Sequence, residues 1–215
     1  MLTQILIFDG FDELDALAPF EVLTRATEIR PDFTVQLATL EPQEEVTGAH
    51  GAKLRTRALL SIASPPDVLV VPGGGWAARS AQGVLAETKR GAVPAAIAGL
   101  HRGGRTLIAS VCTGAMLLAS AGILRGRNAV THHVAIADLA AAGAQIVHAR
   151  VVDDGEIVTA GGVTSGLDLA LWLLERLFGA QVASAVEERL EYERRGTVWR
   201  RPPEAERRQG PVAIV

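Results

Sequence analysis

Thr106-Leu107-Ile108-Ala109-Ser110-Val111-Cys112-Thr113-Gly114 is the stretch around which the chain is organised. Residues 106–109 form a short apolar run with β-branched members, which suits a buried strand and is too short for a helix. From Thr113 onward the sequence changes to Thr-Gly-Ala-Met-Leu-Leu-Ala-Ser-Ala, which is rich in good helix formers. The stretch therefore predicts a strand that runs directly into a helix, with Cys112 at the junction.

Cys112 is the only cysteine in the chain and has small residues on both sides of the junction. This layout matches the sharp strand-to-helix turn that exposes the nucleophilic serine of hydrolases. Free N–H groups at the start of a helix favour a thiolate over a thiol, so we predict a reactive cysteine here. The alternative is a small, inert core residue, and the residues alone leave both interpretations open.

The rest of the chain alternates strands with helices, which predicts an α/β fold. We expect a three-layer sandwich of the flavodoxin-like kind, with helices on both faces of a mostly parallel sheet. Residues 1–193 form a single domain in this prediction, and residues 194–215 form a basic, solvated or partner-packed extension with six arginines and two glutamates. The expected strands are 4–8, 33–40, 53–56, 67–71, 106–109, 129–131, 145–148 and the hairpin 151–159, and the expected helices are 14–29, 84–90, 93–102, 113–121, 134–141, 165–178 and 181–193.

Three features converge on one edge of the predicted sheet. They are the acidic turn after Phe8, the glycines 73–75 that follow the strand ending at Val71, and Cys112. In open α/β sheets ligands bind outside the carboxyl ends of the strands. We therefore expect the functional site at this edge.

A cysteine nucleophile needs a group that moves protons and donors that stabilise negative charge. Asp15 lies among apolar neighbours at the start of a predicted helix, where burial would raise its pKa toward neutrality. The alternative for Asp15 is a carboxylate that only complements the helix dipole. The amides of Gly74, Gly75 and Thr113 are suited to an oxyanion hole, although three glycines in a row also fit a tight loop without a ligand.

Histidines could also serve a cysteine, but Thr113 rather than histidine follows Cys112. His132 and His133 follow a predicted strand and could approach the site from there, or could satisfy local hydrogen bonds only. Trp76, directly after the glycines, is a further candidate for lining a pocket. No spacing resembles a zinc site, and the glycine loop lacks the lysine of a phosphate-binding loop, so we expect no metal and no cofactor.

Composition limits the class of protein. The chain has 215 residues, of which 48% are hydrophobic and 21% charged, as in a globular domain. A net charge of -3 gives no reason to expect nucleic acid as a partner. A lone cysteine fits a reducing compartment, and we expect a cytoplasmic protein because neither a signal peptide nor a membrane-spanning run is present.

Several of these stretches together resemble the DJ-1/PfpI superfamily, within the class I glutamine-amidotransferase-like fold. The stretches are Glu13-Leu14-Asp15, Val71-Pro72-Gly73-Gly74 and Ser110-Val111-Cys112-Thr113-Gly114. Thr131-His132, Gly161-Gly162-Val163-Thr164, Gly166-Leu167-Asp168 and Leu190-Glu191-Tyr192 make the chain most similar to the isocyanide hydratase branch.

The resemblance implies Cys112 as nucleophile, Asp15 as the nearby acid, Thr113 as a residue that shapes the site, and a homodimer. The implied substrate is a small molecule, an isocyanide, whose carbon the thiolate attacks to give a thioimidate and then an N-formamide. Two other activities stay open for this superfamily: redox or stress sensing through an oxidisable cysteine, and glyoxalase-type action on small aldehydes. Thr113 in place of histidine argues against a peptidase, and His133 stands where the hydratase branch carries tryptophan.

Overall fold

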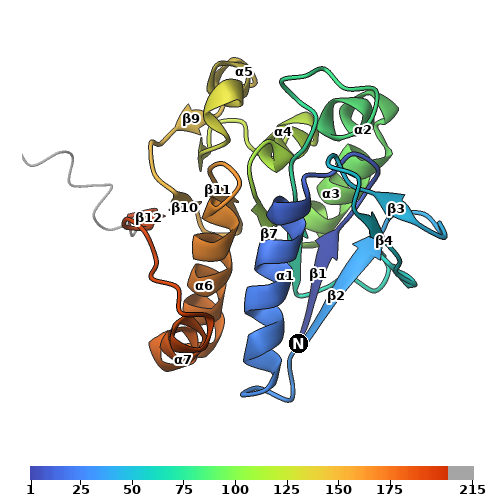
Figure 1. Cartoon of the computed structure of the whole chain (residues 1–215). Coiled ribbons are helices and arrows are strands. Elements are labelled where there is room, and N and C mark those ends of the chain that lie inside the picture. Colours follow the sequence, from blue (N-terminus) through green and yellow to red (C-terminus); the bar gives the residue numbers. More distant parts are fainter. Residues whose placement is uncertain (203–215) are drawn as a thin grey trace, which may run out of the picture.

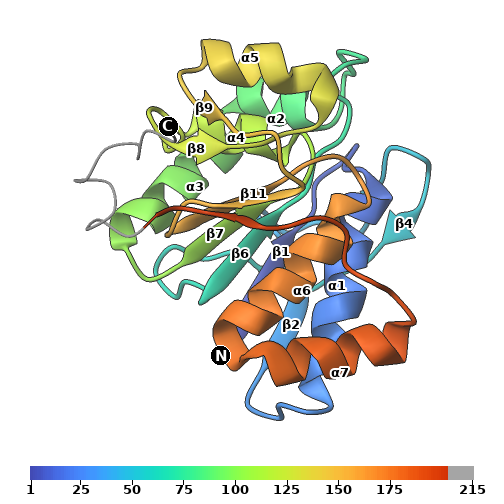
Figure 2. The ribbon, with the colours of Figure 1, turned by 90° about the vertical axis from the view of Figure 1, so that its left-hand side faces the viewer.

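The computed structural model describes residues 1–202 and contains an eight-stranded sheet between two layers of helices (Figures 1 and 2). The strand order is β12-β10-β11-β7-β6-β1-β2-β5, and every neighbouring pair is parallel except β10 with β11. The predicted α/β three-layer fold with a mostly parallel sheet is confirmed.

The central strands place three chain segments at one edge of the sheet. The chain leaves this edge after β1 (Leu2–Leu6), β6 (Val68–Val71) and β7 (Leu107–Ser110). All four residues of β6 are buried, because the sheet is covered on both faces. Val71 pairs with Ser110 in the parallel register, so the two chains turn out of the sheet at the same level.

The outer strands extend the sheet on both sides. On one side lie β2 (Thr34–Thr39) and β5 (Ala58–Leu59). On the other, β11 (Ile157–Ala160) and β10 (Val151–Asp153) form the antiparallel hairpin predicted from the sequence. Two small two-stranded sheets, β3 (Val46–Thr47) with β4 (Lys53–Leu54) and β8 (Asn128–Ala129) with β9 (Gln145–Ile146), lie outside the main one.

The helices divide into two packed groups. α1 (Glu13–Thr27), α6 (Ser165–Phe178) and α7 (Ala180–Leu190) contact one another on one face of the sheet (Figure 2). α2 (Val84–Arg90), α3 (Ala92–Gly103) and α4 (Gly114–Ser120) contact one another on the opposite face. A 3-10 turn (His133–Ala135) leads into α5 (Ile136–Ala141) above this second layer (Figure 1).

The start of α1 determines where the acidic side chains lie. Asp12 caps the helix, since its Oδ1 accepts a hydrogen bond from the Leu14 N–H at 3.2 Å. The first turn then carries Asp15 toward the interior, where its side chain is buried. The helix ends at Thr27, two residues before the predicted end, and Pro19 lies inside it without ending it.

The first part of the predicted C-terminal extension contacts the domain, although several of its residues are exposed. Arg194 forms ion pairs with Glu175 and Glu187, which belong to α6 and α7. β12 (Trp199–Arg200) then pairs in parallel with β10 at the edge of the main sheet. This short strand carried no sequence signal of its own, because a two-residue pairing needs no hydrophobic pattern. Residues 203–215 of the predicted extension lie outside the described residues.

Across residues 1–202, the structure contains no helix with the length and apolar character required to cross a membrane.

Candidate active site

Cys112 occupies the predicted strand-to-helix turn in a strained conformation. Its φ angle is +56°, a left-handed conformation that costs a non-glycine residue of order 1 kcal/mol or more. The Cys112 N–H donates to the carbonyl oxygens of Gly161 (2.8 Å) and Ala160 (3.1 Å), which fixes the turn. Gly114 is required for this turn, since a Cβ atom there would lie 2.2 Å from the carbonyl oxygen of Val71.

A second hydrogen bond fixes the turn from the other side. The Thr131 hydroxyl, which is buried, donates to the Cys112 carbonyl oxygen at 2.8 Å. Thr131 was part of a stretch carrying the family resemblance, but sequence reasoning assigned it no role. Thr131 lies two residues after β8, and its small polar side chain gives no local signal, because only the fold brings it to the turn.

Asp15 is fully buried beside the cysteine. Its Oδ2 accepts a hydrogen bond from the Gly73 N–H at 3.0 Å. A Cβ atom at Gly73 would lie 2.6 Å from Thr113 N and 2.8 Å from Asp15 Oδ2, so the three segments after β1, β6 and β7 meet closely here. The predicted juxtaposition of the acid, the glycine loop and the cysteine turn is therefore present.

Burial, assisted by the negative charge of Asp12, raises the pKa of Asp15 to about 7. The hydrogen bond from the Gly73 amide and the interaction with the Cys112 thiol both oppose this rise. Oδ1 of Asp15 is buried and has no well-aligned hydrogen bond from the described residues. This oxygen is therefore free to take a proton from the thiol or to hold a water molecule.

The resting cysteine is a thiol, contrary to the thiolate predicted from its position before a helix. Cys112 is only 7% exposed, and burial together with the charge of Asp15 raises the pKa of the thiol to about 12. The Thr113 and Val163 amides donate toward the sulfur and lower this pKa, but by less than burial and Asp15 raise it. Near neutral pH, Cys112 and Asp15 thus behave as one pair that holds at most a single negative charge.

Val163 supplies an amide that sequence reasoning did not assign. Its φ angle is +41°, which is unusual for a β-branched residue and turns its N–H toward the sulfur. The pair Gly161-Gly162 before a helix was the available signal, since such a pair permits a tight loop beside another chain segment. The donor pair at the sulfur is therefore Thr113 and Val163.

The Gly74 amide is not free to act as one of the predicted anion-binding donors. The Gly74 N–H already donates to the Thr113 hydroxyl oxygen at 3.0 Å, and this bond joins the loop after β6 to the cysteine turn. Gly75 packs against the 80–83 segment, where a Cβ atom would lie 2.7 Å from the Gln82 carbonyl oxygen, and the role of its amide as an anion-binding donor stays a prediction. Of the three predicted donors, the structure brings only the Thr113 amide to the thiol.

His132 lies at the rim of the site, packed on the loop that carries the Val163 amide. A Cβ atom at Gly162 would lie 2.4 Å from Cδ2 of its ring. Burial and the neighbouring His133 lower the pKa of His132, which favours the neutral ring, and its Nδ1 accepts from the Val134 N–H at 3.3 Å. His133 is exposed and stacks on His132 with ring centres 4.2 Å apart.

Trp76 is half-buried and tied to α5. Its indole N–H donates to Asp138 at 2.7 Å. This bond connects the glycine loop after β6 with the segment that follows the two histidines.

One group of side chains has the composition of a metal site. Asp12, Glu13 and His50 bring one ligand atom each within 4.8 Å of one another. However, the Glu13 carboxylate accepts hydrogen bonds from the His50 and Ala52 amides and contacts the His50 ring at 2.7 Å. These hydrogen bonds explain why the three side chains lie together: they attach the 48–52 loop to the start of α1.

Comparison with known proteins agrees with this geometry. Residues 3–176 match the model of the DJ-1/PfpI family. The chain is 34% identical to the isonitrile hydratase of Pseudomonas putida over 189 residues, which cover 87% of this chain and 76% of that protein.

Solved structures show the same fold. A ThiJ/PfpI family protein from Pseudomonas syringae superposes with a TM-score of 0.77 and 28% identity, covering 91% of this chain and 76% of the other. The DJ-1 protein of Schizosaccharomyces pombe superposes with a TM-score of 0.75 over 90% of this chain and 100% of its own, at 18% identity. With the family model covering most of the chain and the cysteine turn in place, the chain belongs to the DJ-1/PfpI family.

Proposed function

We propose that the protein is a cysteine-dependent hydratase that converts isocyanides to N-formamides. The observation that carries the proposal is the buried pair of Cys112 and Asp15, with the pKa of Asp15 raised to about 7. A carboxyl group with this pKa can accept and return a proton near neutral pH. The similarity to the isonitrile hydratase of Pseudomonas putida supports an isocyanide as the substrate.

In the first step, the Cys112 sulfur bonds to the terminal carbon of the isocyanide R–NC while Asp15 takes the thiol proton. Asp15 then delivers this proton to the same carbon, which gives the thioimidate Cys112–S–CH=N–R. The Thr113 and Val163 amides donate toward the sulfur and stabilise the negative charge that it carries during attack.

In the second step, a water molecule adds to the thioimidate carbon, and one of its protons moves to nitrogen. The C–S bond breaks, the formamide R–NH–CHO leaves, and the remaining hydroxyl proton returns through Asp15 to the sulfur. The free Oδ1 of Asp15 is the group that positions this water. The sum of both steps is the addition of one water molecule to one isocyanide.

The structure favours this chemistry over redox sensing. Cysteines that sense peroxide are accessible and have a low pKa, because the thiolate is the form that reacts. Cys112 has the opposite properties, since it is 7% exposed and its pKa is raised. Activation here depends on proton transfer to Asp15 during the reaction, which suits attack on a bound substrate.

The homodimer implied by the family resemblance belongs to this proposal as well. The exposed side chains of Leu14 and Val134 flank Asp15 and the histidines in sequence, and an interface there would cover them. Sedimentation velocity measures the oligomeric state directly: a single species of twice the chain mass supports the dimer, and a monomer at micromolar concentration refutes it.

The activity is tested with the purified protein and an aryl isocyanide, with formamide followed by chromatography. The wild type should turn over, while the variants Cys112→Ala and Asp15→Asn should fall to the uncatalysed rate. Thr131→Val, which removes a hydrogen bond to the turn and leaves both reacting groups, should keep part of the activity. Absence of formamide with the wild type, or full activity in Cys112→Ala, would refute the proposal.

A further inference from the structure

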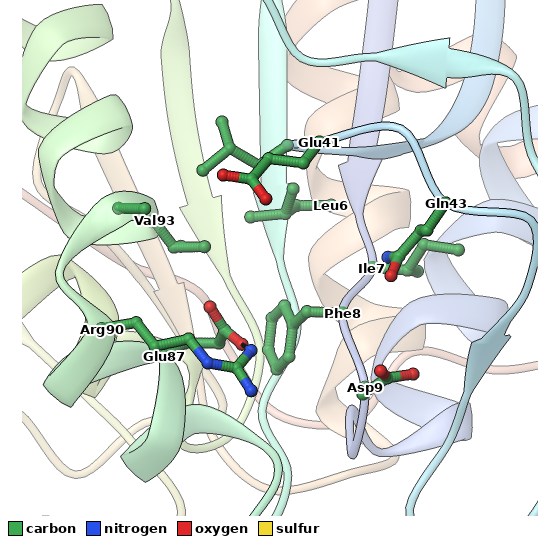
Figure 3. A pocket seen from close by; sticks show the side chains of 11 residues that line it. Leu6, Ile7, Phe8, Asp9, Glu41, Gln43, Glu87, Arg90 and Val93 are labelled. Atoms are coloured by element: carbon green, nitrogen blue, oxygen red, sulfur yellow. Dashed lines mark hydrogen bonds and ion pairs between the residues drawn. The ribbon is translucent and has the colours of Figure 1, made fainter.

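A cavity of about 110 Å³ lies apart from the cysteine site, at the carboxyl ends of β1 and β2 beside the junction of α2 and α3 (Figure 3). Neither Cys112 nor Asp15 is among the residues that line it. One part of the wall is apolar and includes Leu6, Phe8, Leu40 and Val93. Because one water molecule takes about 30 Å³ in the liquid, the cavity has room for several waters or for a short organic ion.

Glu87 is a charged residue buried in the wall of this cavity. It is 5% exposed, and its carboxylate is directed toward the Phe8 ring (Figure 3). Its Oε1 pairs with Arg90 one turn later on α2. In the described part of the chain, Oε2 has no hydrogen-bond partner and is not among the buried unsatisfied atoms, so solvent reaches this oxygen and it remains available as an acceptor. A ligand that donates a hydrogen bond could therefore reach Oε2 without displacing Arg90 from Oε1.

The charges around the cavity are unbalanced. Asp9, Glu41 and Glu87 contribute three carboxylates, whereas Arg90 is the one cationic side chain among the lining residues. Asp9 and Glu41 act on Glu87 by charge repulsion and, after burial, raise its pKa. The Arg90 side chain is 59% exposed and reaches Glu87 from the outside, so solvent can compete with it.

We propose that this cavity binds a small organic cation, an alkylammonium ion, with its charged group at Glu87 and its carbon chain over Phe8 and Leu6. The buried carboxylate provides a charge-assisted acceptor, and the aromatic ring provides a surface that attracts cations. A metal ion fits less well, because within residues 1–202 the three carboxylates do not bring ligand atoms within 4.8 Å of one another. The apolar wall would also leave a hydrated metal ion without partners.

The arrangement predicts opposite effects for the two residues of the ion pair. Glu87→Gln removes the acceptor charge and should weaken binding about tenfold or more. Arg90→Ala removes the cationic side chain that pairs with the Glu87 carboxylate, and should tighten binding by about threefold or more. If the ion pair has only a structural role, both variants should bind the cation more weakly, or both should bind it as the wild type does.

Binding is measured by titrating the full chain with n-propylammonium chloride and following the methyl NMR signals of Leu6, Leu40 and Val93. Propionate and 1-propanol serve as the anionic and neutral probes of the same size. We expect saturable shifts with the ammonium ion only. Equal shifts with 1-propanol would show that only the apolar wall binds, and would overturn the proposal, as would an absence of saturable shifts.

Two further variants keep the test decisive if Glu87→Gln folds poorly. Glu41→Gln changes an exposed carboxylate of the same cavity and should weaken binding by about threefold. Glu188→Gln changes an exposed carboxylate on α7, away from the cavity, and should leave binding unchanged. Unchanged binding in Glu41→Gln together with unchanged or weaker binding in Arg90→Ala would overturn the proposal.

Discussion

Replacing Asp15 with asparagine should stabilise the fold at alkaline pH while removing the proton acceptor of Cys112. Asp15 is fully buried, and its pKa is raised from 3.8 to about 7. A carboxyl group whose pKa is raised by folding binds a proton more tightly in the folded state than in the unfolded state. Its ionisation therefore lowers the stability of the fold as the pH rises between these two pKa values.

The magnitude follows from the size of the shift. A difference of about three pKa units corresponds to roughly 4 kcal/mol at a pH well above 7. Part of this loss of unfolding free energy is already present at about pH 4.5, because the carboxyl of Asp15 is mostly ionised in the unfolded chain at that pH. Between about pH 4.5 and pH 8.5, the wild type should thus lose about 3 kcal/mol of unfolding free energy relative to Asp15→Asn.

Urea unfolding of both proteins at the two pH values measures this difference directly. Ionisable groups away from the site change the unfolding free energy of both proteins equally, so their effect cancels when one protein is compared with the other. Asp32→Asn is the matched control, because Asp32 is exposed and its hydrogen bond with Arg30 lowers its pKa, so this variant should gain no stability at alkaline pH. If the unfolding free energies of wild type and Asp15→Asn differ by the same amount at both pH values, folding does not raise the pKa of Asp15 and the reasoning is refuted.

Three further predictions concern the site and its support. The kcat/KM for isocyanide hydration should rise as the pH increases through about 7, because the ionised form of Asp15 accepts the thiol proton; a pH-rate profile that falls over this range contradicts that role. Gly73→Ala should reduce kcat/KM at least 100-fold and lower the unfolding free energy by about 1–3 kcal/mol, since its Cβ would lie within 2.8 Å of three site atoms, whereas Gly103→Ala, with open space around it, should be neutral. Asp168→Asn should lower the raised pKa of Tyr192, the only tyrosine in the chain, as followed by ultraviolet titration, and cost about 3 kcal/mol in urea unfolding; an unchanged phenol pKa would show that Asp168 does not act on it.

The parts of the fold with strong local patterns could be predicted from the sequence. The buried strand at 68–71 is a continuous apolar run, and the hairpin at 151–160 has β-branched residues around Asp154-Gly155. The short strands at 58–59 and 199–200 could not be predicted, because tertiary pairing with a neighbouring strand forms them rather than any local preference.

Some residues of the candidate site could likewise be predicted from the sequence, and others could not. Asp15 and Cys112 could be paired from the sequence, since each follows a predicted strand and both strands end at one edge of the sheet. The Val163 amide could not be assigned, because its direction depends on a φ angle of +41° that a valine sequence does not indicate. The sequence predicted a lowered pKa for Cys112, because the thiol precedes a helix, and this prediction is wrong. Burial and the neighbouring charge of Asp15 raise the pKa, and only the folded structure shows these two effects.

The proposed reaction depends on bond formation between the Cys112 sulfur and the isocyanide carbon. Intact-protein mass spectrometry tests this most directly, after Asp15→Asn and wild-type protein are mixed with an aryl isocyanide and quenched in acid within milliseconds to minutes. We expect a mass increase equal to one isocyanide, located on the peptide that contains Cys112 and transient in the wild type. It should be absent from Asp15→Asn, which lacks the acceptor of the thiol proton, and from Cys112→Ala. Formamide production without any such adduct, or an adduct that persists in Cys112→Ala, would contradict the account.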